Sequence, residues 1–243
     1  MVVDNLIKSC SCGNTESFTP SHEHNIDLLI CDACGTPHQY LPGWTPEKVT
    51  DFYKNMYHTD AQLSIGHQAY KDRYDHDFKV SNIRLDAYKE FIAPGMTGLD
   101  IGSSNSAFVH AAIERGIKCK GVEVGKDIGD TKVTIRKPIQ DVTNIEDGSL
   151  DFATMHDVLE HIVDVRVVLT KLKSLIKVGG TLIVDIPDYF VEQGLHHWRP
   201  VQHLWFWNEH QLGQLLEEFK FNPVKITKPI PGKVVFYCRR VSE

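Results

Sequence analysis

A short turn of small residues offers the clearest binding chemistry in the sequence. Asp100-Ile101-Gly102 closes an apolar run and opens into Ser103-Ser104-Asn105-Ser106, and a helical pattern follows. Glu123 stands 21 residues after Gly102, at the end of a second apolar segment. In dinucleotide-binding folds the backbone of such a turn approaches the ligand, and the later acid accepts hydrogen bonds from two ribose hydroxyls. The spacing therefore predicts a nucleoside site in an α/β domain.

The turn residues narrow the kind of nucleoside. Ser104 and Ser106 occupy the two later positions of the usual Gly-x-Gly-x-Gly pattern. A pyrophosphate must sit against the helix N-terminus, and residues bulkier than glycine obstruct that approach. A ligand without phosphate tolerates serine, so the turn favours such a ligand over NAD or FAD.

Two cysteine pairs near the N-terminus have the composition of a zinc site. A glycine follows each pair, and the four residues are Cys10, Cys12, Cys31 and Cys34. Four thiolates complete a closed tetrahedral site, and the glycines let the chain turn around the ion. Free thiols rarely pair twice at such spacing, and a reducing cytosol removes disulfides as the explanation. The first pair has one intervening residue where two are usual, so His22 or His24 stays open as a replacement for one cysteine.

Hydrophobic periodicity predicts the elements that must position these residues. Strands are expected at 97–101, 119–123, 133–138, 150–155, 181–186, 222–228 and 233–240. Helices are expected at 46–56, 81–91, 106–115, 157–176 and 209–219. A parallel crossover with its helix needs about ten residues or more. The stretch from Gly125 to Lys132 is too short for that, so a bare turn is expected there.

Several motifs together resemble class I S-adenosylmethionine-dependent methyltransferases. They span roughly residues 74–240 and are Val158-Leu-Glu-His161, Lys177-Val-Gly-Gly-Thr-Leu182 and Gln202-His-Leu-Trp-Phe-Trp207. The cysteine pairs, Gln39-Tyr-Leu-Pro42 and the aromatic run from Phe52 to Tyr57 are similar to zinc-ribbon-bearing members that act on sugars, glycans and other small metabolites. The resemblance implies a Rossmann-like α/β sheet of seven strands whose last hairpin is antiparallel. The domains it implies are a zinc ribbon at 1–45, a helical lid or linker at 46–92 and an S-adenosylmethionine-binding methyltransferase domain at 93–243.

The same resemblance implies roles for particular residues. Asp100 and Gly102 approach the methionine moiety, Glu123 takes the ribose, and His156 lies beside the sulfonium. Asp141 or Val142 meets the adenine amine, although Asp141 as a helix N-cap stays open. The cofactor-binding residues expected are Tyr74, Asp100, Gly102, Ser103, Glu123, Val124, Asp141, Val142 and His156. Tyr74 is expected to cover the methionine end of the cofactor.

Methyl transfer to a hydroxyl or amine also needs a proton acceptor. His203 is the first candidate because Gln202-His203-Leu-Trp-Phe matches the substrate-side motif of the family, and His156 and His161 follow it. A histidine with the ordinary pKa of about 6.5 would give a rate that rises with pH through that value.

A divalent cation is the alternative to a simple base. Asp157, Glu160 and His161 stand at i, i+3 and i+4, so they share one face of the expected helix. With His203 they resemble the metal site of metal-dependent small-RNA and quinone O-methyltransferases. Deoxysugar C-methyltransferases carry a Tyr-His-Glu-His cluster where this chain has Pro200-Val-Gln-His203, which favours O- or N-methylation here.

Composition bounds the partners. The net charge is −6 and the chain has no basic run, so a long nucleic-acid substrate is disfavoured. It has no apolar run of the ~18 residues that span a membrane and no signal peptide pattern, so a cytoplasmic protein is expected. The leading hypothesis is a methyltransferase for a small or glycan-like acceptor. An RNA methyltransferase that binds through its ribbon, and a non-catalytic protein of the same fold, remain the alternatives.

Overall fold

The computed structural model describes residues 5–53, 73–126 and 128–243. The chain forms two compact units. One contains Met1–Pro46, His156–Lys173 and Leu182–Glu243, and the other contains Glu47–Met155 and Ser174–Thr181. The N-terminal ribbon thus folds into the same unit as the C-terminal segments of the chain.

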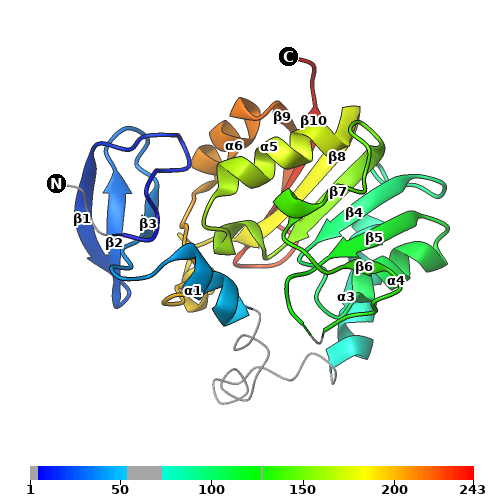
Figure 1. Ribbon diagram of the computed structural model, residues 1–243, viewed down its shortest axis with the longest axis horizontal. Helices are drawn as coiled ribbons and strands as arrows, with labels where there is room; N and C mark the ends of the chain where they lie inside the picture. The colour runs from blue at the N-terminus through cyan, green and yellow to red at the C-terminus, as the bar shows by residue number, and fades with distance from the viewer. Residues whose placement is uncertain (1–4, 54–72, 127) are drawn as a thin grey trace. The chain divides into compact units, whose positions relative to one another are not determined.

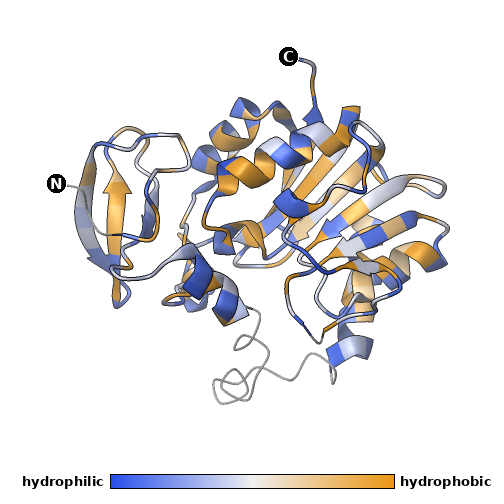
Figure 2. Ribbon diagram, in the orientation of Figure 1, coloured by the Kyte–Doolittle hydropathy of each residue, from blue (hydrophilic) through white to orange (hydrophobic). Residues whose placement is uncertain are grey.

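The ribbon contains a three-stranded antiparallel sheet in the order β1-β2-β3 (Figure 1). Its strands are β1 Phe18–Glu23, β2 Ile26–Cys31 and β3 Pro37–Gln39. The central strand is the apolar one (Figure 2), and its Ile26 and Leu28 are buried against Tyr189 and Phe206 of the same unit. A sheet this small cannot enclose a core alone, so its apolar face depends on residues that come late in the sequence.

The second sheet has seven strands in the order β6-β5-β4-β7-β8-β10-β9. The pairs β6-β5, β5-β4 and β4-β7 are parallel, and β10-β9 is antiparallel. The strands are β4 Thr97–Ile101, β5 Lys118–Val122, β6 Thr134–Ile135, β7 Leu150–His156, β8 Ile176–Pro187, β9 Phe221–Thr227 and β10 Lys233–Arg240. The expected seven-stranded α/β sheet with an antiparallel last hairpin is confirmed.

Two strands differ from their predicted bounds. β6 has two residues where 133–138 was expected, because Pro138 has no N–H for a sheet ladder and the 3-10 helix η3 Ile139–Asp141 follows it. β8 begins five residues before the predicted 181–186, since Gly179 and Gly180 lie within the strand. The other boundaries lie within one residue of the prediction.

The helices described are α1 Pro46–Asp51, α3 Tyr74–Ala87, α4 Ala107–Glu114, α5 Val165–Leu175 and α6 Glu209–Glu218. α4 and α6 confirm the helices expected at 106–115 and 209–219. Of the helix expected at 46–56, α1 is described, and positions 54–56 lie outside the described residues. α3 begins seven residues before the predicted 81–91 helix, with Asp75 and Asp77 in a first turn where carboxylates are favourable. Within the described ranges, no helix combines the length and apolar character that crossing a membrane requires.

Polar contacts fix the helices within each unit. Arg115, which follows α4, donates to the side chain of Asn82 and pairs with Asp86, both on α3, at 2.8 and 2.6 Å. Asn208 starts α6 with a capping box, and Arg166 of α5 pairs with Glu218 at the other end of α6. The capping box gives two of the backbone amides at the start of α6 their hydrogen-bond partners.

Candidate functional site

The turn after β4 has a left-handed backbone at three positions. Gly102, Ser104 and Ser106 have φ angles of 70°, 47° and 66°. These positions carry glycine in the usual pattern, so the fold keeps the glycine-like backbone where serine stands. Serine in this region costs roughly 1–2 kcal/mol. The amides of Gly102 and Ser103 both donate to the Val122 carbonyl of β5, at 2.8 and 3.1 Å, which holds the turn against the neighbouring strand.

Glu123 follows β5 and lies directly beside this turn. One carboxylate oxygen accepts from the Ser104 amide at 2.9 Å and the other from the Gly125 amide at 2.8 Å. The residue is 7% exposed, so it is a buried acid and not an exposed charge at the end of a strand. A carboxylate oxygen accepts more than one hydrogen bond, so both can still take a ribose hydroxyl. The two amides therefore fix the orientation of the carboxylate beside the turn.

Buried hydroxyl groups without partners also gather at the turn. Among the described residues, the hydroxyls of Ser103 and Ser104 are buried and have no hydrogen-bond partner. A Cβ on Gly121 of β5 would lie 2.3 Å from Ser103 Oγ, so that glycine makes the space for the serine. Asp100, 3% exposed, accepts from the Thr154 hydroxyl at 2.7 Å. An unpaired buried hydroxyl costs about 1–3 kcal/mol, which a polar ligand at this edge would recover.

The short crossover after Glu123 is a clamped loop. In the described residues 124–126 and 128–133 there is no helix, which confirms the expected bare turn. Arg136 donates to the carbonyls of Gly125 and Gly129 at 2.7 and 3.0 Å. The Asp130 amide donates to Ser106 Oγ at 2.9 Å, so the loop also closes onto the turn after β4. One arginine thus does the positioning that a crossover helix would otherwise do.

Replacing Ser104 with glycine should leave the free energy of unfolding unchanged or raise it by up to about 1 kcal/mol, because left-handed strain and an unpaired buried hydroxyl are both removed. Ser106→Gly is the matched control. It relieves the same strain but deletes the hydroxyl that bonds Thr134 Oγ1 at 2.8 Å and the Asp130 amide, so a loss of about 1–2 kcal/mol is expected. Urea denaturation measures both. Equal losses in the two variants would contradict this account of the turn.

The other predicted cofactor residues lie in different surroundings. Tyr74 starts α3, and its hydroxyl bonds His110 Nδ1 at 2.7 Å. Asp141 is exposed within η3, so its interpretation as a helix N-cap is wrong, and Val142 beside it is fully buried. The remaining two, Val124 after β5 and His156 at the end of β7, are half-buried.

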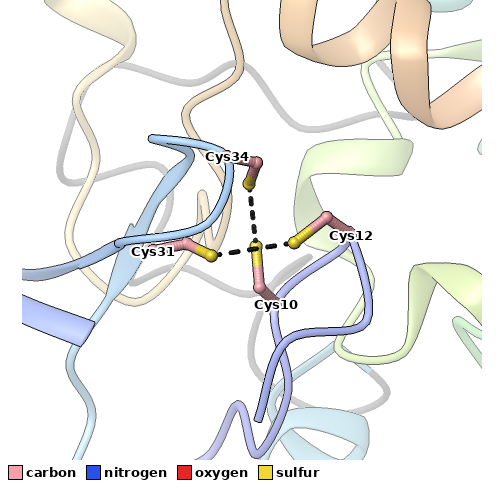
Figure 3. A group of neighbouring side chains, drawn as sticks. All are labelled: Cys10, Cys12, Cys31 and Cys34. Carbon is pink, nitrogen blue, oxygen red and sulfur yellow. Dashed lines mark hydrogen bonds between the residues drawn. The ribbon is translucent and has the colours of Figure 1, made fainter. Parts of the chain in front are cut away.

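The four N-terminal cysteine thiols converge from two loops (Figure 3). The Sγ atoms of Cys10 and Cys34 are 3.5 Å apart, those of Cys12 and Cys31 are 3.7 Å apart, and all four lie within 4.8 Å of one another. In a tetrahedral site with Zn–S bonds of ~2.3 Å the sulfurs are about 3.8 Å apart, so this group fits zinc. Burial raises the pKa of the Cys10 thiol, and a bound cation offsets that cost by stabilising the thiolate.

Ser11, the single residue between Cys10 and Cys12, has a structural role of its own. Ser11 is 3% exposed, its hydroxyl accepts from Trp207 Nε1 at 3.1 Å, and its carbonyl accepts from Arg166 at 2.8 Å. The first cysteine loop is therefore anchored to the C-terminal segments of its unit through the residue that separates the thiols.

Neither His22 nor His24 joins the cysteine group. The β1–β2 register pairs His22 with Asp27 near the hairpin turn, and Cys31 with Phe18 at the opposite end. His22 bonds the Asp27 carboxylate at 2.7 Å, and the His24 ring packs on Trp198 with centroids 4.7 Å apart. The alternative in which a histidine replaces a cysteine is therefore wrong.

The helix expected at 157–176 is wrong at its start. Asp157 has a φ of 55° and forms an ion pair with Lys233. The 3-10 helix η4 Leu159–His161 follows, and α5 starts only at Val165, after Asp164 Oδ1 accepts from the Val167 amide at 3.1 Å. Asp157 therefore shares no helix face with Glu160 and His161. The structure brings Glu160, His161 and His203 together without it.

These three residues form what we call the histidine–glutamate cluster: Glu160, His161 and His203. The Leu204 amide donates to the Glu160 carbonyl at 2.8 Å, which joins η4 to the segment that carries His203. The rings of His161 and His203 meet edge to face with centroids 4.6 Å apart. His161 Nδ1 lies 2.7 Å from the Gln202 carbonyl oxygen, and His203 Nδ1 lies 2.9 Å from the Tyr189 hydroxyl.

Burial controls the charge of the cluster. It lowers the pKa of His161 to about 4, even though the Gln202 carbonyl favours the protonated ring. Burial, then the nearby His161 and Arg199, hold the pKa of His203 well below its usual range. Burial and the charge of Asp185 raise the pKa of Glu160 to about 8. Both imidazoles are therefore neutral at pH 7.

The ribbon holds the chain that carries His203. Gln39 of β3 is 1% exposed, and its amide nitrogen donates to the carbonyls of His203 and Arg199 at 2.6 and 2.9 Å. Its amide oxygen accepts from the Val201 amide at 2.9 Å. Val201 has a φ of 67°, a strained conformation for a β-branched residue. One side chain from the ribbon thus fixes both ends and the strained centre of the loop before His203.

Sequence reasoning missed Gln39, Arg136 and Tyr189 as positioning residues. Each acts through a contact between segments far apart in the sequence or through a loop conformation. The sequence does contain one signal for Gln39, which lies three residues before Pro42 in the motif after the second cysteine pair. That motif indicates that the segment matters, but it does not indicate that Gln39 contacts the loop before His203.

Known proteins show the same fold. A family model described as a methyltransferase domain matches residues 75–226, which is more than half of the chain, and no curated protein matches. The 1,6-didemethyltoxoflavin-N1-methyltransferase of Burkholderia thailandensis is similar with a TM-score of 0.62 and 16% identity, over 92% of this chain and 99% of that one. A SAM-dependent methyltransferase from Archaeoglobus fulgidus is similar with a TM-score of 0.58 and 17% identity, over 67% of this chain and 94% of that one. Geranyl diphosphate C-methyltransferase from Streptomyces coelicolor is similar with a TM-score of 0.58 and 12% identity, over 80% of this chain and 98% of that one. At these identities the solved structures show the fold alone.

Proposed function

Because this chain belongs to the methyltransferase-domain family and is an S-adenosylmethionine-dependent methyltransferase, we propose that it methylates a hydroxyl or amine of a small or glycan-like acceptor. The observation that best supports S-adenosylmethionine binding is the arrangement of residues at the turn after β4. There the oriented Glu123 carboxylate can accept hydrogen bonds from the ribose hydroxyls. The hydroxyls of Ser103 and Ser104, which have no partner in the protein, can bond other polar groups of the ligand. Asp100, Gly102, Val124 and the 139–142 segment complete the proposed nucleoside site.

Several findings support a small acceptor. The B. thailandensis relative was solved with 1,6-didemethyltoxoflavin and S-adenosylhomocysteine, and the S. coelicolor relative with geranyl diphosphate and S-adenosylhomocysteine. A net charge of −6 opposes a long polyanionic substrate. The proposed proton acceptor is His203, whose neutral imidazole is held by Tyr189 and by the ribbon. His156 and His161 are the other candidates.

The ribbon cysteines are proposed to hold one structural zinc ion, which would tie the two cysteine loops together. Thiolate coordination of this kind fits a reducing compartment, so we place the protein in the cytoplasm. The ion takes no part in the transfer itself. Its effect on catalysis passes through β3 and Gln39.

Calorimetry with S-adenosylmethionine tests the proposal, with NAD as the negative control. Replacing Glu123 with alanine should weaken S-adenosylmethionine binding by about 1–3 kcal/mol, because a charged acceptor for ribose hydroxyls is lost. Glu146→Ala, at an exposed acid, is the matched control and should bind normally. Equal binding by the Glu123 variant would place the ribose partner elsewhere. Binding of NAD but not of S-adenosylmethionine would overturn the proposal.

The acceptor class is read from a methylation screen. With labelled S-adenosylmethionine, label should move to small metabolites in a cell extract, and RNA digestion of the extract should not reduce it. Salt-dependent retention of RNA with label in the RNA would favour the RNA methyltransferase, and cofactor binding without any labelled product would favour the non-catalytic protein.

A further inference from the structure

Three polar side chains from separate segments are hydrogen-bonded in a row. The Tyr74 hydroxyl, at the start of α3, bonds Nδ1 of His110 in α4 at 2.7 Å. On the other side of the ring, His110 Nε2 bonds Asp130 Oδ2 in the crossover loop at 3.2 Å. All three residues lie in the compact unit that also contains the turn after β4. We call Tyr74, His110 and Asp130 the tyrosine triad.

The Asp130 end of the tyrosine triad is held in place. Asp130 Oδ1 accepts from the Lys132 amide at 2.8 Å, and the Asp130 amide donates to Ser106 Oγ at 2.9 Å. Hydrogen bonds from the Lys132 amide and from His110 lower the pKa of Asp130. The carboxylate is therefore ionised at pH 7, and an ionised carboxylate can only accept hydrogen bonds.

This carboxylate sets the direction of both hydrogen bonds in the tyrosine triad. Because Asp130 only accepts, His110 Nε2 carries the proton of the bond between them. In a neutral imidazole the other nitrogen is an acceptor, so His110 Nδ1 accepts from the Tyr74 O–H. The phenol proton is thus used within the triad, and only the lone pairs of the Tyr74 oxygen are left for a ligand. In this state the phenol can accept from a ligand or contact a cation, but it cannot donate to an anion.

The charges around the phenol favour the same kind of ligand. Burial, then the negative charges of Glu114, Asp75 and Asp130, raise the pKa of Tyr74, so the phenol stays protonated. The same carboxylates make the potential at the phenol negative, which attracts a cation and repels an anion. S-adenosylmethionine carries a positive sulfonium and a positive ammonium group at its methionine end. Both the lone pairs and the field of this site therefore suit that end of the cofactor.

We propose that His110 and Asp130 are positioning residues for the cofactor, which orient the Tyr74 hydroxyl so that its oxygen contacts a positively charged group of the methionine end. The proposal rests on the proposed function, because it concerns the same cofactor. Neither His110 nor Asp130 belongs to the motifs that resemble the methyltransferase family. The crossover loop, which lacks the usual helix, thus supplies the carboxylate that sets the polarity of the phenol.

Calorimetry on the full-length protein with two ligands tests the proposal. The ligands are S-adenosylmethionine and 5′-methylthioadenosine, which shares the adenosine but has neither the sulfonium nor the amino-acid group. The measurements are made at pH 8, where histidine is ordinarily neutral. Tyr74→Phe and His110→Phe should each weaken S-adenosylmethionine binding about 5- to 30-fold and leave 5′-methylthioadenosine binding within about 2-fold. Asp130→Asn, which removes the charge that fixes the tautomer, should weaken S-adenosylmethionine alone by at least about 3-fold.

Two further variants separate orientation of the phenol from support of the fold. His110→Gln can still accept from Tyr74 and donate to Asp130, so its S-adenosylmethionine affinity should stay within about 3-fold of wild type. His76→Phe, at an exposed histidine of α3, is the matched control and should bind both ligands normally.

Equal weakening of both ligands in His110→Phe and Tyr74→Phe would show that the tyrosine triad only supports the fold, and would overturn the proposal. Unchanged S-adenosylmethionine binding in those two variants would overturn it as well, while the proposed function would stand. Failure of the wild-type protein to bind S-adenosylmethionine would instead overturn the proposed function, and this proposal with it.

Discussion

Replacing His203 with alanine should lower the turnover number by about 10²–10⁴-fold and leave S-adenosylmethionine affinity nearly unchanged. The reason is the same whether the ring accepts a proton or binds a cation, because the alanine offers no nitrogen beside Glu160. Steady-state kinetics at saturating cofactor and acceptor measure the change. His210→Ala, at an exposed histidine on α6, is the matched control and should be close to wild type.

The pH profile provides a second measurement on the same residue. The imidazole of His203 is already neutral well below pH 6.5, because burial depresses its pKa. The turnover number should therefore show no ionisation near 6.5, where an ordinary histidine would titrate and where the sequence alone predicted a rising limb. A normal turnover number in the His203 variant would refute both roles and leave alignment of the two substrates as the source of rate.

Removing the ribbon metal should have the largest effect on stability. Structural zinc contributes on the order of 10 kcal/mol in small metal-dependent folds, so a strong chelator, or Cys31→Ser with Cys34→Ser, should unfold the ribbon. The loss should extend beyond the ribbon, because Gln39 then releases the loop before His203. Hydrogen exchange measures this at the His203 amide, which bonds the Arg199 carbonyl at 3.2 Å in the native protein.

Gln39→Leu is the milder counterpart of metal removal. It should keep one tightly bound zinc and all four thiolate ligands, but lose about 1–3 kcal/mol of stability, because one buried and two part-buried backbone groups lose their hydrogen-bond partner. Turnover should fall and cofactor affinity should not. Full protection of the His203 amide in the metal-free protein would show that the loop does not depend on the ribbon.

The sequence predicted those parts of the structure that follow from local pattern. The apolar run, the small turn and the acid at position 123 predicted β4, its turn and the Glu123 carboxylate beside it, because strand ends and turns are encoded by neighbouring residues. The paired cysteines predicted a thiol group in the same way. The three left-handed angles after β4 were implicit in the glycine pattern, even though two of those residues are serine.

What local pattern did not contain was long-range pairing. The spacing of Asp157, Glu160 and His161 fits a helix, so the sequence alone groups them as possible metal ligands. In the structure Asp157 has a left-handed φ and pairs with Lys233, 76 residues later, so it lies apart from the other two. Gln39 bonds a carbonyl 164 residues away, and Ser11 bonds a tryptophan 196 residues away. Such contacts depend on the tertiary fold, and hydrophobic periodicity carries no information about them.

The long reach from Gln39 to His203 also has a consequence for how the protein is made. A ribosome adds roughly 5–20 residues per second, so Gln39 is made about 8–30 s before His203, which lies 164 residues later. The ribbon can bind its metal during that interval, and the later segment then meets a template that is already rigid. In metal-starved cells the loop before His203 would be made while the ribbon is still unfolded, so Gln39 could not hold it. The yield of active enzyme should then follow the zinc supply at the time of synthesis, and zinc added to finished, misfolded chains should restore less of it.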